Sequence, residues 1–114
     1  MHKFDLEERS TEFAKKVICL CKSLPRNPIN DRLTGQTVGS AGSVGANYRE
    51  ANDALGKKDF VHRLRIARKE TKEVIHWLVL IAEANSNFQL KINELIKEAN
   101  ELKKIFSSII EKSQ

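Results

Sequence analysis

Apolar residues recur along the chain at alternating steps of three and four, which is the periodicity of a helix with one packing face. In the first segment this stripe begins at Leu6 and the pattern ends before Pro25. Its members are Leu6, Ser10, Phe13, Val17, Leu20 and Leu24. Asp5 and Glu8 have the spacing of a capping box, so we expect the helix to start with Asp5 as its N-cap.

Three further segments repeat this spacing. They run from about 31 to 55, with Gly56 as a stop signal, from about 58 to 84, and onward from a turn at 85–87. Their predicted core positions are Leu33, Thr37, Ala41, Val44, Tyr48, Ala51 and Leu55; Phe60, Leu64, Ala67, Thr71, Val74, Leu78 and Ala82; and Phe88, Ile92, Leu95, Ala99, Leu102, Phe106 and Ile109.

Four helical stripes of similar length are best buried in one shared core. The connections between them are short, about three to seven residues, so consecutive helices should run antiparallel. Aromatic residues make up only 6% of the chain and there are two prolines, which also favours helix over strand. The sequence therefore predicts an all-α, up-down-up-down four-helix bundle that forms a single domain over residues 1–114.

Four of the five glycines fall within the second helix, in the stretch GQTVGSAGSVGANYREA. No phosphate-binding glycine motif is present, because neither its spacing nor a preceding strand occurs. On a helix, Gly35, Gly39, Gly42 and Ala46 form one stripe away from the predicted core. Each interior glycine costs about 1 kcal/mol relative to alanine, so we expect another helix to pack closely there. An irregular helix with glycine hinges is the alternative.

The third helix also has a second surface. Ile66, Trp77 and Leu80 lie opposite its core stripe, with Glu70 and Glu73 among them. A lone bundle would leave this mixture of apolar and acidic groups exposed. Two helices with two faces each indicate self-association into a homo-oligomer.

Basic residues gather in the third helix. Residues 57–72 hold seven Lys or Arg against two acidic residues, a local net charge of +5 that equals the formal charge of the whole chain. One helix face carries Lys58, His62, Arg65, Lys69, Lys72 and His76, with Arg68 at its edge. This face is either a solvated surface or a site for the phosphates of RNA or DNA, and we predict Lys58, Arg65, Arg68, Lys69 and Lys72 as the contacts. Without interleaved aromatic residues, base stacking is not predicted.

Other candidate chemistry is weak. Cys19 and Cys21 point in different directions on one helix and are interpreted as reduced thiols. Glu73 and His76 have the Glu-x-x-His spacing of di-iron bundles, but the further motifs of such a site are missing. We predict no metal and no cofactor. No apolar run is long enough to span a membrane and no signal segment is visible, so we expect a cytoplasmic protein with no membrane association.

Specific motifs resemble a known family. Gly-Ala-Asn-x-x-Glu at Gly45–Glu50, then Asp-Phe, Ile-Ala-x-Lys-Glu and Trp-Leu, are similar to the bacterial four helix bundle proteins, also called 23S rRNA intervening-sequence proteins. The match is specific over roughly residues 33–85. The chain departs from the family pattern at Gly42, where members often carry a larger residue, and at His76, where an aromatic is common.

This resemblance implies an antiparallel bundle that assembles as a homopentamer and has no established enzymatic activity. The family is also similar to the accessory protein of diversity-generating retroelements, which binds reverse transcriptase and nucleic acid. The motif residues then join the subunit interface, predicted as Gly35, Gly39, Gly42, Ala46, Asn47, Glu50, Ile66, Glu70, Glu73 and Trp77.

Two functions follow as expectations. The first is a non-enzymatic oligomer that binds nucleic acid, or a nucleoprotein partner such as a reverse transcriptase, through the basic face. The second is a structural or protein-interaction scaffold without affinity for nucleic acid. The carboxylates of Glu50, Glu70 and Glu73, with Asn47, could serve acid/base chemistry, but we interpret them as partners of Arg49, Arg63 or Arg68 that fix helix register or subunit contacts.

Overall fold

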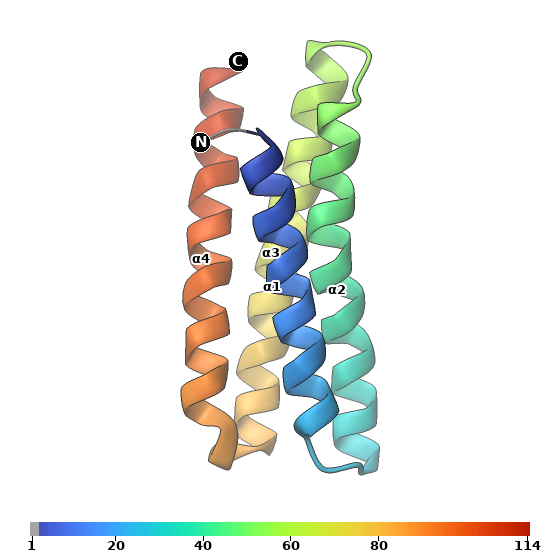
Figure 1. The fold of residues 1–114 in the computed structure, drawn as a ribbon, viewed down its shortest axis with the longest axis vertical. Helices are drawn as coiled ribbons and strands as arrows, with labels where there is room; N and C mark the ends of the chain where they lie inside the picture. The colour runs from blue at the N-terminus through green and yellow to red at the C-terminus, as the bar shows by residue number, and fades with distance from the viewer. Residues whose placement is uncertain (1–2) are drawn as a thin grey trace.

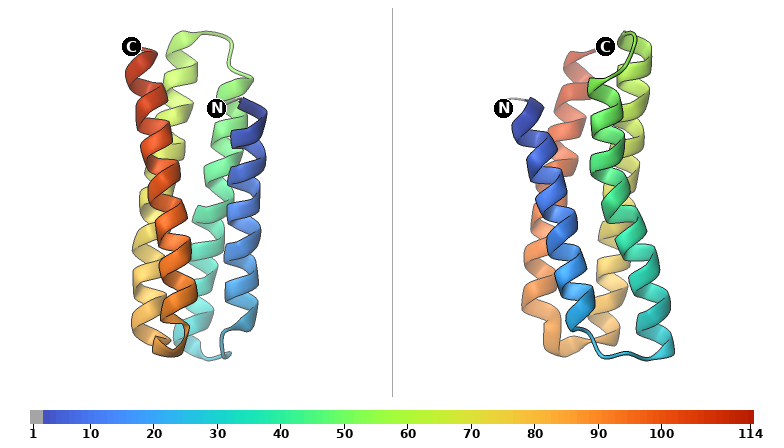
Figure 2. Two further views of the ribbon diagram at one scale, coloured as in Figure 1. Left: turned by 60° about the vertical axis from the view of Figure 1, so that its left-hand side comes forward. Right: turned by 45° about the vertical axis from the view of Figure 1, so that its right-hand side comes forward.

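The computed structural model describes residues 3–114 and confirms an all-α four-helix bundle. The helices are α1 (Lys3–Ser23), α2 (Pro28–Asn52), α3 (Lys57–Ala84) and α4 (Gln89–Lys112), with a short 3₁₀ turn, η1 (Ser86–Phe88), before α4. Neighbours in sequence run antiparallel and α4 closes the ring against α1 (Figures 1 and 2). The most extensive packing joins α2 to α3.

The core lies along the axis of the bundle, as the alternating pattern predicts. All six positions of the first predicted stripe are buried, including Leu24, which follows the end of α1. The centre is filled by large side chains such as Phe13, Phe106 and Leu64, and Tyr48 packs against Phe106 with ring centroids 5.7 Å apart. Ser10, the polar step in the α1 stripe, is fully buried because it faces Gly45 of α2.

The predicted helix ends need correction. Helix α1 already includes Lys3, so Asp5 lies in its first turn and is not the N-cap. Its negative charge still suits the helix N-terminus.

Helix α2 stops at Asn52, so Leu55 falls in the connection and is fully exposed instead of joining the core. Gly56 is the N-cap of α3 and not the stop signal of α2. In α4, Ile110 is buried, whereas the predicted Ile109 is only partly covered.

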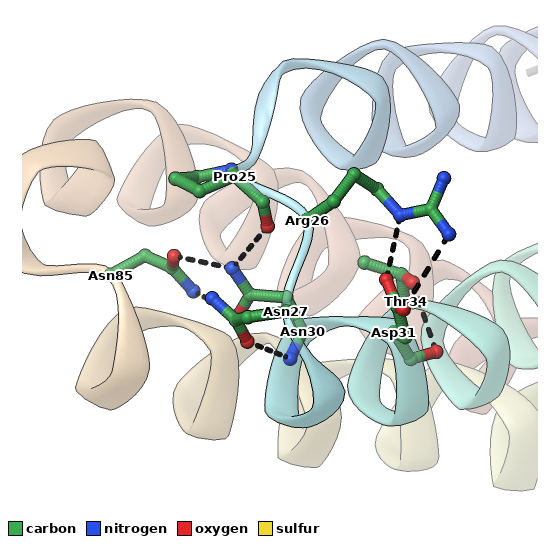
Figure 3. Close-up of polar contacts among 7 residues, drawn as sticks. All are labelled: Pro25, Arg26, Asn27, Asn30, Asp31, Thr34 and Asn85. Carbon is green, nitrogen blue, oxygen red and sulfur yellow. Dashed lines mark hydrogen bonds and ion pairs between the residues drawn. The ribbon is translucent and has the colours of Figure 1, made fainter.

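Helix α2 begins at Pro28, three residues before the predicted start. Asn27 is its N-cap, and the Asn27 side-chain oxygen accepts a hydrogen bond of 2.8 Å from the Asn30 backbone N–H. Proline is well suited to the first helical position because its fixed φ is helical and its missing N–H needs no partner there. Figure 3 shows this cap beside the Arg26–Asp31 ion pair, in which the closest nitrogen and oxygen are 2.7 Å apart.

Two buried asparagines clasp one end of the bundle. The side-chain amides of Asn30 and Asn85 exchange two hydrogen bonds of 2.9 and 2.8 Å (Figure 3). Each amide nitrogen also donates to a backbone carbonyl, that of Pro25 at 2.8 Å and that of Ile81 at 2.9 Å. This asparagine clasp ties the α1–α2 connection to the end of α3.

Ion pairs attach α1 to its neighbours. Arg9 donates through two nitrogens to the two oxygens of Glu98 on α4, at 2.7 and 2.8 Å. Arg49 of α2 donates to Glu7 at 2.9 Å. The hydrogen bond to Glu98 raises the pKa of Arg9 above its ordinary value.

Candidate nucleic-acid interface

The predicted phosphate contacts converge on one hollow between α2 and α3. Arg65, Arg68, Lys69 and Lys72 line it, and its volume is about 580 Å³. Helix α3 positions these side chains because steps of three and four residues return to nearly the same face. The remaining predicted contact, Lys58, lies about 10 Å earlier along the helix, given the rise of 1.5 Å per residue, and does not line the hollow.

The two arginines at the hollow, Arg65 and Arg68, differ from most arginines of the chain in lacking carboxylate partners. Arg9, Arg26, Arg49 and Arg63 each form an ion pair. Within residues 3–114, none of the hollow's four cations is in such a pair. Arg68 is half-buried and donates to the Ser107 hydroxyl of α4 at 3.3 Å, whereas Arg65, Lys69 and Lys72 are exposed. The charge of the last three is therefore available to a ligand.

Four further residues complete the hollow, and among them only His76 was predicted to lie on the basic face. Gln36 reaches it from α2, and His76, Glu73 and Trp77 line it from α3. The rings of His76 and Trp77 meet edge to face, with centroids 5.1 Å apart. The helical pattern predicts Glu73 and Trp77 for the subunit surface, opposite the core stripe of this helix. The helix geometry is consistent with their place in the hollow, since Trp77 is only about 80° around the helix from Lys69.

The predicted subunit surface borders the same hollow. Gly35, Gly39, Gly42 and Ala46 are exposed on α2, and a Cβ added at any of these three glycines would meet nothing within 4 Å. On α3 the predicted contacts are half-buried, namely Ile66, Glu70, Glu73 and Trp77. On α2, Asn47 is half-buried and Glu50 is exposed. The three glycines thus have open space beside them within one chain, and the role of the stripe in assembly stays a prediction.

The carboxylates on this surface are not held by the arginines that we expected. Arg49 donates to Glu7 and Thr11, Arg63 lies 3.9 Å from Asp59, and Arg68 donates to Ser107. Asn47 instead donates to the Ser43 carbonyl of its own helix at 2.9 Å. The interpretation that these arginines fix the acidic groups is therefore wrong within one chain.

Glu70 is an acidic group whose surroundings disfavour charge. Partial burial raises its pKa above the ordinary value, and the neighbouring charge of Glu73 raises it further, while Lys69 acts in the opposite direction. A carboxyl group whose pKa is raised in the folded state stabilises the fold at low pH, where the group is protonated. This contribution to the free energy of unfolding is lost as the pH rises through the raised pKa. Glu70 therefore slightly opposes folding of the isolated chain at neutral pH.

The cysteines differ in reactivity. Burial raises the pKa of Cys21 to about 11, whereas Cys19 is exposed. At pH 8 only about one Cys21 side chain in a thousand is then a thiolate, the form that reacts with alkylating reagents. We expect iodoacetamide to modify Cys19 well before Cys21, as measured by fragment-resolved mass spectrometry. Equal rates for the two thiols in the folded protein would contradict this.

Neither a metal site nor a membrane span is found in the part of the chain that the structure describes. No group of three or more His, Cys, Asp or Glu side chains there could hold a metal ion. No helix within residues 3–114 is long and apolar enough to cross a membrane.

The comparison with protein families matches residues 2–108 to the model described as 23S rRNA-intervening sequence protein. The chain therefore belongs to the 23S rRNA-intervening sequence protein family. A similar solved structure is a protein of unknown function from the S23 ribosomal protein family of Bacteroides thetaiotaomicron. It has 30% sequence identity and a TM-score of 0.85, and the alignment covers 97% of this chain and 99% of that one. Among curated proteins, none matches the chain.

Proposed function

We propose that this member of the family is a non-enzymatic homo-oligomer that binds RNA or DNA through the basic side chains of α3. The observation that carries the proposal is the convergence of four cations without carboxylate partners on one hollow. A nucleoprotein that contains a reverse transcriptase is a candidate partner through the resemblance to the retroelement accessory protein.

Self-association would strengthen this binding. A phosphate backbone releases counterions when basic groups neutralise it, so affinity grows with the number of cations presented together. One chain carries a formal charge of +5, so five copies would present about 25 positive charges in excess. The glycine stripe of α2 lets another helix approach closely, and the half-buried Ile66 supplies apolar area beside it.

The test of nucleic-acid binding is a titration of the purified protein with labelled RNA and DNA across a salt series. The proposal expects affinity for both that falls steeply with salt, since phosphates are the main contacts. Absence of binding at low salt would favour the scaffold without nucleic-acid affinity. An affinity that does not change with salt concentration would also contradict an electrostatic interface.

Self-association is tested by Gly39→Leu. The added side chain has free space within one chain and improves helix propensity, so the fold should be kept. It would nevertheless obstruct a helix packed against the stripe. By light scattering we expect five copies of 13.0 kDa for the natural protein and a monomer for the variant. The control Lys104→Leu, at an exposed site on α4, should remain assembled. A natural protein that is monomeric would refute self-association through this surface.

A further inference from the structure

Trp77 lies in the same hollow as the unpaired cations, which gives the site an aromatic surface beside its charges. We propose that this hollow accepts one unpaired base of an RNA or DNA strand against Trp77, while successive phosphates of the same strand lie on Lys72, Lys69 and Arg65. The inference rests on the proposed nucleic-acid binding and specifies which form of nucleic acid the site takes.

The aromatic ring of Trp77 remains partly exposed. Its side chain is half-buried, and its ring lies edge to face with that of His76. A flat aromatic ring is the usual platform for a nucleobase in single-strand binding. Bases inside a duplex are already stacked on their neighbours, so only an unpaired base can use this surface.

The cations follow the helix axis away from Trp77. Arg65, Lys69 and Lys72 span about 10 Å along α3, at 1.5 Å per residue. Since none of them is committed to a carboxylate within the described residues, they can track the phosphates of a strand that runs along the helix. The hollow is open to solvent and has a volume of about 580 Å³.

Polar groups in the hollow favour a base at one end and a phosphate at the other. The carboxylate of Glu73 lies at the Trp77 end and would repel a phosphate there, whereas it can accept a hydrogen bond from the exocyclic amino group of a base. The amide of Gln36, which enters from α2, can both donate to and accept from a base edge. The base is thus favoured at the Trp77 end and the phosphate toward Arg65.

The test uses the fact that Trp77 is the one tryptophan of the chain, so intrinsic fluorescence reports on this site alone. Three ligands are titrated into the natural protein: a twelve-residue single strand, a duplex of the same sequence, and an abasic strand with the same number of phosphates. We expect the single strand to quench the fluorescence and to bind about tenfold more tightly than the other two, the effect of one stacked base.

The outcomes separate this inference from the proposed function. Equal binding of all three ligands without quenching would overturn the nucleotide site and leave salt-dependent binding intact. No binding of any ligand would refute both. A free mononucleotide that binds as tightly as the strand would also overturn the inference, because it would make the hollow a site for a small molecule.

Variants of the hollow supply the second readout. Trp77→Leu should abolish the preference for the single strand and leave duplex binding unchanged, whereas Trp77→Phe should retain most of the preference. Light scattering must show the same mass as for the natural protein, because Trp77 also borders the predicted subunit surface. If the mass of Trp77→Leu differs, Gln36→Ala, at an exposed position, replaces it and should lower the preference a few-fold. A preference that survives in the variant of natural mass would overturn the inference.

Discussion

Changing Arg65, Lys69 and Lys72 together to glutamate is expected to weaken RNA and DNA binding by about a hundredfold or more at moderate salt. The variant loses three cations that are free of carboxylate partners and places three negative charges at the hollow. The slope of log affinity against log salt should become shallower by about two, since each phosphate contact on a single strand contributes about 0.7. Fluorescence anisotropy with labelled strands across a salt series measures both quantities.

The matched control reverses the same amount of charge elsewhere. Lys91, Lys97 and Lys104 are exposed on α4, and their change to glutamate lowers the net charge equally. This control should lose affinity only modestly, through the general field of the protein. Equal losses in the two variants would mean that total charge, and not the hollow, determines binding. Circular dichroism should show a native helix content for both, because all six side chains lie outside the core.

Replacing Asn85 with alanine is expected to lower the free energy of unfolding by about 2–4 kcal/mol. The change removes the reciprocal amide pair and leaves the Asn30 side-chain oxygen and the Ile81 carbonyl without these partners in a buried place. An unpaired buried polar group costs about 1–3 kcal/mol, which explains the size. Urea denaturation followed by circular dichroism measures the loss.

Two comparisons isolate the asparagine clasp. Asn87→Ala, at an exposed position in the same connection, should change stability by less than about 0.5 kcal/mol. The double variant Asn30→Ala with Asn85→Ala should lose less than the sum of the single variants, because each single change already breaks the pair. Fully additive losses would show that the two amides do not act together.

The sequence was sufficient to predict the helices because burial follows a local period. Every predicted core position from Leu64 to Ala82 in α3 is buried as the steps of three and four require. Helix ends were predicted less well. The Asn27-Pro28 pair marks the start of α2, because asparagine is a favourable N-cap and proline a favourable first residue. The apolar pattern predicted a start near Asp31 instead. Leu55 was misplaced because the apolar pattern continues beyond the helix that carries it.

Contacts between distant segments account for what the sequence did not predict. Nothing local marks Asn30 and Asn85 as partners, since 55 residues separate them. The hollow is a similar case, because Gln36 joins it only through the packing of α2 on α3. Trp77 was not predicted to line the hollow for a different reason. The helical projection assigned each residue to one face, whereas long side chains such as Lys69 and Trp77 reach across the boundary between two faces.

The asparagine clasp also gives the bundle unequal mobility along its length. It locks the end where α1 meets α2 and α3 meets η1, whereas no side-chain hydrogen bond caps α3 at the α2–α3 connection. Local opening requires the loss of few buried contacts there. Amide hydrogens near Ala54 should therefore exchange with solvent sooner than the Asn30 backbone amide, so that the bundle opens from its unclasped end.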